Sequence, residues 1–310
     1  MILVTGVSGA LGGSILEGLR ADGLAVAGAS SSGDGAGVRH ADFDRPQTLE
    51  AALAGVDVLV FVSAGYAEDD VVLARHGAVV RAAAAAGVKH VIYTSLAGSG
   101  DLLTIALAHR WTEGRLAEAP FDVTVLRNGL YAELAAGMAL TGAASAAETG
   151  VFAAPFGDGR LPVVAREDLA AVAVRVAAET WADLAAGARG RHAGRTYELE
   201  GVSAVGGHDL AEVLSEALGR PVEYRTVPLG EVRPLLAGLE AYQAGHTISM
   251  FSTINAGLLE ARHSDLPAFL EPRPALDVIA ATVKSSLRPR ACPPGPPAPA
   301  RPPVPPRQPR

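Results

Sequence analysis

The stretch Met1-Ile2-Leu3-Val4-Thr5-Gly6-Val7-Ser8-Gly9-Ala10-Leu11-Gly12-Gly13 opens the chain and decides its fold. In it a short apolar run ends at Thr5, three glycines follow at a spacing of three residues, and an apolar-periodic segment then begins. This order predicts a buried strand that turns sharply into a helix. Gly6 permits the tight turn, Gly9 leaves space for a pyrophosphate near the backbone, and Gly12 lets the helix pack closely on the sheet.

The start of this helix is a predicted anion site. Its first backbone N–H groups have no partner within the helix, and the helix dipole adds positive potential at this end. A glycine motif flanked by a strand and a helix in this way is typical of dinucleotide binding. The residues predicted to bind the diphosphate of the cofactor are Gly6, Val7, Ser8, Gly9, Ala10, Leu11 and Gly12.

Composition excludes several classes of protein. The 310 residues are 49% hydrophobic, enough for a substantial core, and the net charge of −7 argues against a nucleic-acid surface. A single cysteine, Cys292, excludes an internal disulfide and a multi-cysteine metal site, and no metal is expected. The first strand is expected from residue 2 and charges interrupt every apolar run before about 18 residues, so we expect neither a signal peptide nor a membrane helix. The chain is therefore predicted to be cytoplasmic.

Strand and helix patterns alternate through residue 126. The run Asp57–Val62 is nearly continuous in β-branched and apolar residues, which is typical of a parallel strand covered on both faces. The other strands are expected at 2–5, 24–29, 38–41, 91–95 and 123–126, and the helices at about 10–21, 45–54, 69–86 and 103–118. This rhythm predicts an α/β fold with a doubly wound parallel sheet, the Rossmann arrangement.

The second half of the chain has a looser pattern. Segment 128–165 is rich in Gly and Ala with few strand signals, and 228–275 looks like irregular helices and loops. Between them, helices are expected at 166–183 and 208–218 and strands at 196–200 and 222–227. Late insertions in open α/β folds cover the carboxyl ends of the strands, so these two segments are predicted to form one small C-terminal α/β substrate lobe on a domain spanning 1–287.

The last residues are different in character. Residues 288–310 hold 11 of the 21 prolines and five arginines, with no acidic residue. Such a segment cannot bury apolar area, so it is predicted to be a disordered tail, partly polyproline in conformation.

With this glycine spacing and strand order, the chain resembles the atypical short-chain dehydrogenases of the NmrA-like group, and within it the NAD(P)H:quinone oxidoreductase type. The resemblance extends over most of residues 1–285. Besides the opening turn, the stretches that carry it are Ala41-Asp42-Phe43-Asp44, Ala86-Gly87-Val88-Lys89-His90-Val91-Ile92-Tyr93-Thr94-Ser95, His109 with Thr112-Glu113, Thr124-Val125-Leu126-Arg127-Asn128-Gly129-Leu130-Tyr131, Gly157-Asp158-Gly159-Arg160 and Ala165-Arg166-Glu167-Asp168-Leu169-Ala170.

Two departures bear on mechanism. The usual proton donor of short-chain dehydrogenases is a Tyr-x-x-x-Lys pair, and none of the six tyrosines has a lysine four residues later. Quinone reductases of this type often have a lysine directly after the glutamate of His-x-x-Thr-Glu, where this chain has Gly114.

The end of the second strand predicts the cofactor. An acidic residue there would bind the ribose hydroxyls of NAD, but this chain has Ser30-Ser31-Ser32. Ser31 can donate to a 2′-phosphate and Arg39, nearby in sequence, can supply the positive charge, so NADPH is expected rather than NADH. The alternative is a loop whose serines bind only water. Asp42 and Phe43 are expected beside the adenine.

The nicotinamide is expected over the carboxyl ends of the strands at 57–62 and 91–95. The small turn Ser63-Ala64-Gly65 lets a cofactor pass close to the backbone, and Tyr93 lies at the neighbouring strand end. Thr94 and Ser95 can hydrogen-bond a substrate oxygen, although hydroxyls at a strand end also cap the next segment.

Three further elements complete the predicted site. His109 and Glu113 share a helix face, where the carboxylate can orient the imidazole for acid–base work; the alternative is an exposed surface pair. Tyr131 offers a donor and an aromatic face for a planar substrate, beside Asn128. Arg127 is predicted to be a structural anchor through bonds to backbone carbonyls, and Asp168 to cap or stabilise the N-terminus of the helix that it begins. The residues predicted to be catalytic are Tyr131, His109 and Thr94.

The missing tyrosine–lysine pair favours a particular acceptor. Hydride transfer to a quinone gives a delocalised hydroquinone anion, whose conjugate acid has a pKa of about 10, as phenol has. Hydrogen bonds alone can stabilise such an anion. The prediction is an NADPH-dependent reductase of a quinone or quinone-like aromatic, without flavin, and with a homodimer as the default assembly. The alternatives are a non-catalytic NADP-binding redox sensor and a tailoring reductase of an aromatic biosynthetic intermediate.

Overall fold

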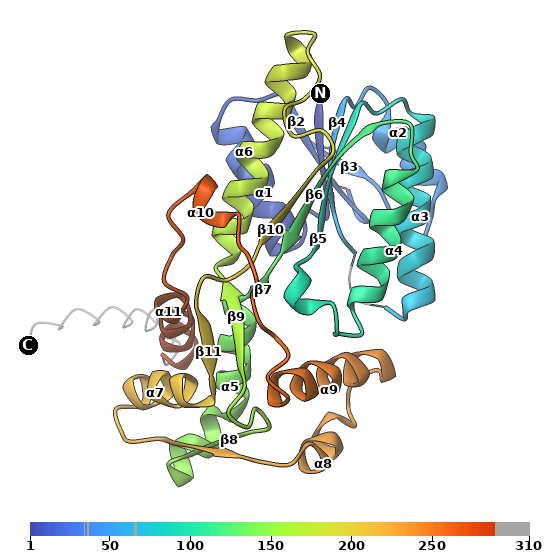
Figure 1. Ribbon diagram of the computed structural model, residues 1–310. Coiled ribbons are helices and arrows are strands. Elements are labelled where there is room, and N and C mark those ends of the chain that lie inside the picture. The colour runs from blue at the N-terminus through green and yellow to red at the C-terminus, as the bar shows by residue number, and fades with distance from the viewer. Residues whose placement is uncertain (34, 36, 65–66, 289–310) are drawn as a thin grey trace, which may run out of the picture.

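The computed structural model describes residues 1–33, 35, 37–64 and 67–288 of the chain. The predicted cofactor residue Gly65, the single cysteine Cys292 and the predicted tail after Arg288 lie outside these residues. Two parts are visible in Figure 1, a sheet flanked by helices and a second unit packed at the end of the sheet. Among the described helices, none is both long and apolar enough to cross a membrane.

The first part is a seven-stranded, fully parallel sheet with the order β10-β6-β5-β4-β1-β2-β3. Its strands are β1 (Ile2–Thr5), β2 (Val26–Ser30), β3 (Val38–His40), β4 (Val58–Val62), β5 (His90–Leu96), β6 (Asp122–Asn128) and β10 (Arg195–Leu199). The chain moves outward from β1 in one direction and from β4 in the other, so the switch point lies between these two strands. The predicted doubly wound parallel sheet is confirmed, and ligands of such sheets bind at this crevice.

Helices cover both faces of the sheet. One face packs against α1 (Ala10–Ala21) and α6 (Arg166–Ala185), with Leu11, Ile15 and Leu169 in the shared core. The opposite face packs against α2 (Gln47–Leu53), α3 (Asp69–Ala85) and α4 (Ala106–Ala117). A short 3₁₀ turn, η1 (Gly98–Gly100), joins β5 to α4. Burial on both faces explains why the strands read as continuous apolar runs.

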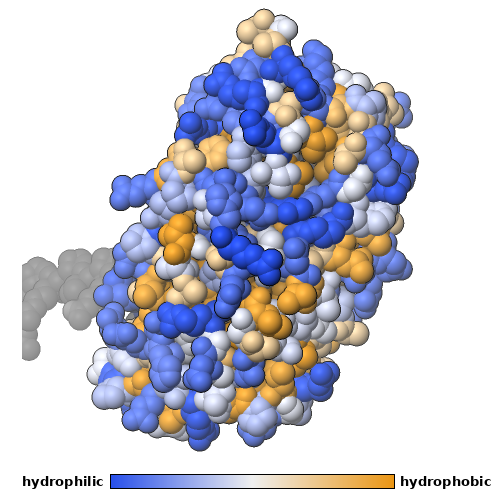
Figure 2. Space-filling model, viewed as in Figure 1, coloured by the Kyte–Doolittle hydropathy of each residue, from blue (hydrophilic) through white to orange (hydrophobic). Residues whose placement is uncertain are grey.

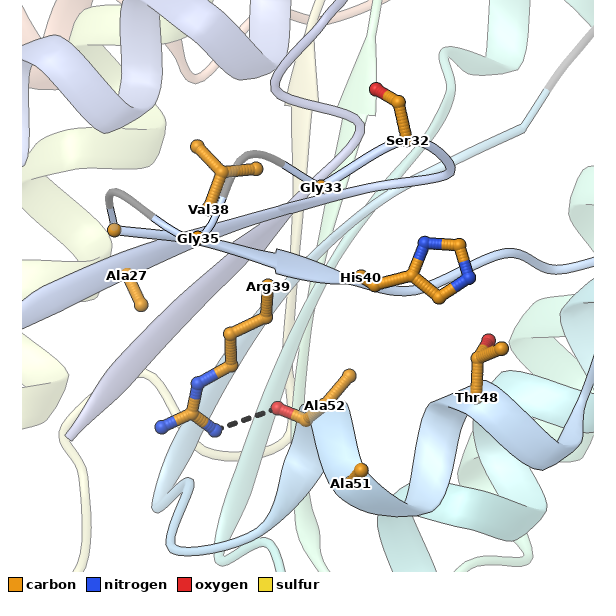
Figure 3. A pocket seen from close by; sticks show the side chains of 11 residues that line it. Ala27, Ser32, Gly33, Gly35, Val38, Arg39, His40, Thr48, Ala51 and Ala52 are labelled. Atoms are coloured by element: carbon orange, nitrogen blue, oxygen red, sulfur yellow. Dashed lines mark hydrogen bonds between the residues drawn. The ribbon is translucent and has the colours of Figure 1, made fainter.

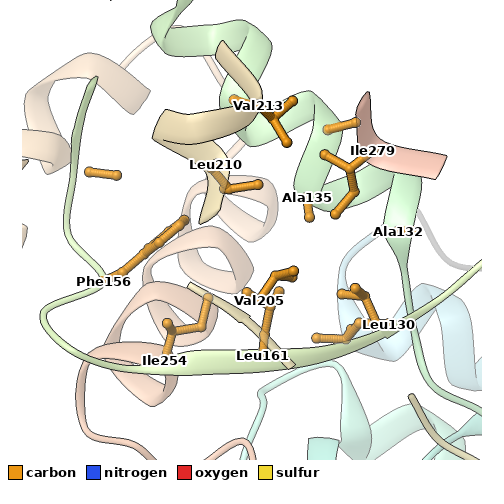
Figure 4. Packing of buried hydrophobic residues seen from close by; sticks show 14 of the residues in the cluster. Leu130, Ala132, Ala135, Phe156, Leu161, Val205, Leu210, Val213, Ile254 and Ile279 are labelled. Atoms are coloured by element: carbon orange, nitrogen blue, oxygen red, sulfur yellow. The ribbon is translucent and has the colours of Figure 1, made fainter. Parts of the chain in front are cut away.

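The second unit, the lobe, has its own apolar core. Figure 4 shows part of it, where Phe156, Leu161, Leu210 and Ile279 point toward one another from strands and helices distant in sequence. The elements after β6, apart from α6 and β10, are β7 (Leu130–Tyr131), α5 (Ala132–Thr149), β8 (Val151–Ala154), β9 (Arg160–Val164), β11 (Ala204–Gly206), α7 (Gly207–Leu218), β12 (Glu223–Thr226), α8 (Leu229–Val232), η2 (Arg233–Leu236), α9 (Ala241–Asn255), α10 (Leu266–Phe269) and α11 (Ala275–Leu287).

The lobe is more regular than its sequence indicates. Segment 128–165, which carries few strand signals, forms the 18-residue helix α5 and three short strands. Small side chains let α5 pack closely, since six of its alanines are buried. Helix α9 likewise lies in the segment expected to be irregular. The face in Figure 2 shows apolar side chains gathered over the lobe and a polar band across the middle of the molecule.

A buried histidine joins β5 to β6 at the far end of the sheet from the crevice. The Thr124 hydroxyl donates to the His192 carbonyl (2.7 Å), so it accepts from Nε2 of His90 (2.8 Å). Nδ1 of His90 then has no hydrogen-bond partner among the described residues, and Gly190 packs beside it. Burial therefore lowers the pKa of His90 from 6.5 to about 4, and the imidazole is neutral in the folded protein.

This histidine predicts a pH-dependent stability. Between pH 4 and 6.5 the unfolded chain binds a proton at His90 that the folded protein does not, so the free energy of unfolding falls as pH is lowered through this window and is fully restored above it. The contribution is about 2–3 kcal/mol. We expect His90→Gln, which does not titrate, to reduce the pH slope of the unfolding free energy by about one proton. Urea unfolding from pH 4.5 to 7.5 measures it, and equal slopes in the two proteins would contradict the prediction.

Candidate active site

The glycine turn between β1 and α1 has little space for side chains. Gly6 has a positive φ of 65° and accepts a hydrogen bond from the Gly9 N–H (3.0 Å), which closes the turn. A Cβ on Gly12 would lie 2.4 Å from the Gly6 carbonyl oxygen, so no larger residue fits there. Thr5 accepts a hydrogen bond from the Val62 N–H (3.0 Å), which ties β1 to β4 at the crevice. The turn thus has the cradle shape that a diphosphate requires.

A cavity lies beside β2 and β3, and the arginine that lines it, Arg39, is already engaged in hydrogen bonds. Figure 3 shows this cavity of about 800 Å³ beside β3 and α2. The predicted phosphate ligand Arg39 points instead to the C-terminal end of α2, where it donates to the carbonyls of Ala52 (2.7 Å) and Ala54 (2.8 Å). The physical reason is that helix C-terminal carbonyls lack intrahelical partners and attract a cation. Exposed His40 and Ser32 lie at the other end of the cavity (Figure 3).

The serines and the expected adenine wall are held by local hydrogen bonds. Ser30 accepts the Gly33 N–H (3.0 Å) and shapes the turn, in which Ser31 is exposed. Asp42 accepts the Asp44 N–H (3.0 Å) and pairs with an arginine, and Phe43 packs edge-on against the sheet. These bonds give a rigid wall at the end of β2 and β3.

The turn after β4 is supported from below by two buried side chains. Thr94, predicted to contact substrate, is 2% exposed and accepts the Ser63 N–H (3.0 Å). His76 accepts the Ala64 N–H at Nε2 (3.0 Å) and donates from Nδ1 to Thr112 (2.8 Å). Burial, with the nearby His109, lowers the pKa of His76 to about 3. His76 was not among the predicted residues, and no local pattern marks a histidine as buried.

Tyr93 and His109 form a hydrogen-bonded pair at the end of β5. The Tyr93 ring is fully buried, so its side chain lies beneath the crevice, and its oxygen is 3.0 Å from Nδ1 of His109. Burial raises the pKa of Tyr93. Burial and the neighbouring Arg110 lower the pKa of His109 to about 4. Both groups are therefore neutral at pH 7.

The predicted partnership of Glu113 with His109 is not formed. The Glu113 carboxylate accepts from Arg127 (2.6 Å), Arg110 (2.7 Å) and the Ser95 hydroxyl (2.5 Å). Two cations attract a carboxylate more strongly than a neutral imidazole does, and they lower the pKa of Glu113 despite its burial. Arg127 also bridges to a carboxylate on β10 (2.7 Å), in keeping with the predicted structural role.

The residues after β6 enter the lobe beside α6. Asn128 is 5% exposed, and its side-chain oxygen has no hydrogen-bond partner in the described part of the chain. The Tyr131 ring is covered on one face by the guanidinium of Arg166, 5.3 Å from the ring centre. Asp168 lies in the first turn of α6 but makes no cap bond there; its carboxylate accepts the Arg273 N–H (2.8 Å), while Glu133 accepts the N–H of Arg166. Within the described residues, no group of three acidic, His or Cys side chains is placed to hold a metal ion.

The sequence model of the NmrA-like family matches residues 1–270 of this chain. Quinone oxidoreductase 2 of Escherichia coli strain K12 is 36% identical to it over 246 residues, which cover 73% of this chain and 78% of that protein. The NAD(P)H azoreductase of Xenophilus azovorans is 28% identical over 250 residues, covering 77% of this chain and 81% of that protein.

Solved structures with bound cofactor have the same fold. Triphenylmethane reductase of Citrobacter sp. in complex with NADP(H) aligns with a TM-score of 0.78 and 28% identity, covering 92% of this chain and 99% of that one. The NADPH-dependent quinone oxidoreductase QOR2 of Escherichia coli in complex with NADPH aligns with a TM-score of 0.77 and 29% identity, covering 91% and 99%.

Gly12 and Gly13 make a matched pair for testing the turn. We expect Gly12→Ala to lower the free energy of unfolding by about 2–3 kcal/mol, because the new Cβ would force α1 away from β1. A Cβ on Gly13 would meet only the Val7 carbonyl at 3.3 Å, so Gly13→Ala should change stability by less than about 1 kcal/mol. Urea unfolding measures both, and equal stability of the two variants would contradict the proposed packing.

Proposed function

The chain belongs to the NmrA-like family, and we propose that this NAD(P)H-dependent oxidoreductase transfers a hydride directly to a quinone or a quinone-like aromatic acceptor, without a flavin. Similarity to quinone oxidoreductase 2 supports the quinone class, and similarity to reductases of azo and triphenylmethane compounds supports a planar conjugated acceptor. The observation that carries the proposal is the neutral His109 held by buried Tyr93 beside the crevice.

The described residues fit a nicotinamide cofactor. The turn at Gly6–Gly12 receives the diphosphate, and a Cβ at its last position would fill this space. The wall of Asp42 and Phe43 receives the adenine. The backbone of Ser63 and Ala64, fixed from below, lies at the nicotinamide end. When bound, the cofactor supplies the hydride.

His109 acts as a neutral hydrogen-bond donor. We assign the Tyr93 hydroxyl as the donor to Nδ1 across their 3.0 Å contact. This assignment places the imidazole proton on Nε2, a nitrogen with no partner among the described residues. An Nε2–H group aimed at an acceptor oxygen stabilises the charge that develops there. The charge of a hydroquinone anion, whose pKa is about 10, is delocalised, so a hydrogen bond from a neutral imidazole stabilises it without giving up the proton. The localised charge of an alkoxide instead needs a transferred proton. This match of donor and acceptor favours a quinone over a simple ketone.

The decisive assay follows NADPH oxidation at 340 nm with benzoquinones and naphthoquinones. We expect turnover by the native chain and a fall of kcat/KM by about 100-fold in His109→Leu, with partial rescue in His109→Gln, whose amide also donates. His263→Leu, which removes an exposed imidazole paired with Asp265, is the control and should be unchanged. Because the pKa of His109 is about 4, no loss of activity should titrate with this residue between pH 5 and 8. Tight NADP⁺ binding without turnover would instead support a redox sensor.

A second experiment concerns the choice between NADPH and NADH. We propose that Ser31, Ser32 and His40 contact the 2′-phosphate, because Arg39 is engaged with α2. His40→Leu should raise the Kd for NADPH about fivefold and leave the Kd for NADH unchanged. Arg39→Met should leave the ratio of the two constants unchanged and lower the Tm, since it removes two bonds to the end of α2. The reverse pattern in isothermal calorimetry would restore Arg39 as the phosphate ligand.

A further inference from the structure

Arg166, the first residue of α6, is a cation without a partner carboxylate. Its backbone N–H donates to Glu133, but in the described part of the chain no carboxylate lies within ion-pair distance of its guanidinium. The two acidic residues that follow it, Glu167 and Asp168, pair with Arg273. The guanidinium is instead fixed over the Tyr131 ring at 5.3 Å. A half-buried, pre-positioned cation of this kind is suited to binding an anion.

The packing of α6 on α1 places this cation near the glycine turn. The groove between the two helices is lined by residues of both, among them Ser14 and Ala170, and a Cβ on Gly18 would lie 2.7 Å from the Val174 side chain. Each helix leads back to the start of a parallel strand, α1 to β2 and α6 to β10, so the two helices run in parallel and advance equally per residue from the Gly18–Val174 contact. The same spacing, continued toward their starts, sets Arg166 level with the first residues of α1. Helix axes in contact lie about 8–10 Å apart, and an arginine side chain can extend across that distance.

From this placement we propose that Arg166 contacts the nicotinamide-side phosphate of the bound dinucleotide. The glycine turn offers only backbone N–H groups and a helix dipole. Arg166 adds a full positive charge, which no carboxylate of the described residues neutralises, whereas Arg273 at the same end of α6 is paired with Glu167 and Asp168. Tyr131 is then a positioning residue, because its ring holds the guanidinium toward the crevice. The inference rests on cofactor binding by this chain, and it is independent of which acceptor is reduced.

Binding measurements test this contact without using turnover. In Arg166→Gln the Kd values for NADPH and NADH should both rise about tenfold, because both cofactors have the same diphosphate. Adenosine 2′,5′-bisphosphate lacks the nicotinamide-side phosphate, so its Kd should change less than about twofold. Arg175→Gln, on the same helix but paired with Glu179, is the matched control and should leave all three constants unchanged.

Variants of Tyr131 separate positioning from direct contact. Tyr131→Phe keeps an aromatic face and should retain the native Kd for NADPH, whereas Tyr131→Leu should weaken NADPH binding about threefold. Unchanged cofactor affinity in Arg166→Gln would overturn the proposal, and so would equal losses for NADPH and adenosine 2′,5′-bisphosphate. A raised KM for a naphthoquinone sulfonate with unchanged cofactor affinity would assign Arg166 to the substrate and would also overturn it. Absence of quinone turnover, with the binding losses as expected, would leave this proposal standing while the proposed function fails.

Discussion

The close approach of α1 to the end of β1 is the constraint on which the site depends. Gly12 brings the helix so near to the turn that the Gly6 carbonyl occupies the space of a side chain, and Gly18 brings the same helix against α6. The two helices run in parallel, because each leads back to the start of a parallel strand, and both begin at the carboxyl edge of the sheet. That edge is where β1 and β4 separate, so two helix N-termini and the crevice share one location.

Most charged side chains around the crevice stabilise the scaffold. Arg127 joins carboxylates from α4 and β10, and Glu200, 2% exposed, accepts the N–H groups of Ser99 and Arg262. The loop after β5 is thereby attached to β10 through carboxylates that burial would otherwise destabilise. Ion pairs of this kind favour the ionised form of each carboxylate, which has no proton to donate. The proposed chemistry at this edge therefore rests on a neutral hydrogen-bonding group, His109.

The sequence predicts the sheet and the turn well because these depend on local patterns. The glycine spacing and the apolar runs are legible without knowing what lies opposite them, and the strands begin and end within a few residues of their expected bounds. Side-chain roles depend on partners distant in the chain, and there the pattern misleads. Arg39 lies close in sequence to the serines but bonds to α2, and Glu113 shares a face with His109 but bonds to arginines. Arg166 becomes notable only once α6 is seen to start beside α1.

The neutrality of the buried histidines limits what the site can reduce. His76 is fully buried and His109 is half-buried, and the environment of each disfavours the charged imidazole. A mechanism that needs a charged imidazole would therefore oppose the same burial that holds the turn after β4 in place. An acceptor that spreads the incoming negative charge over its own ring avoids this conflict. The folding requirement and the proposed use of a conjugated acceptor would thus have the same cause, the low pKa of these two imidazoles.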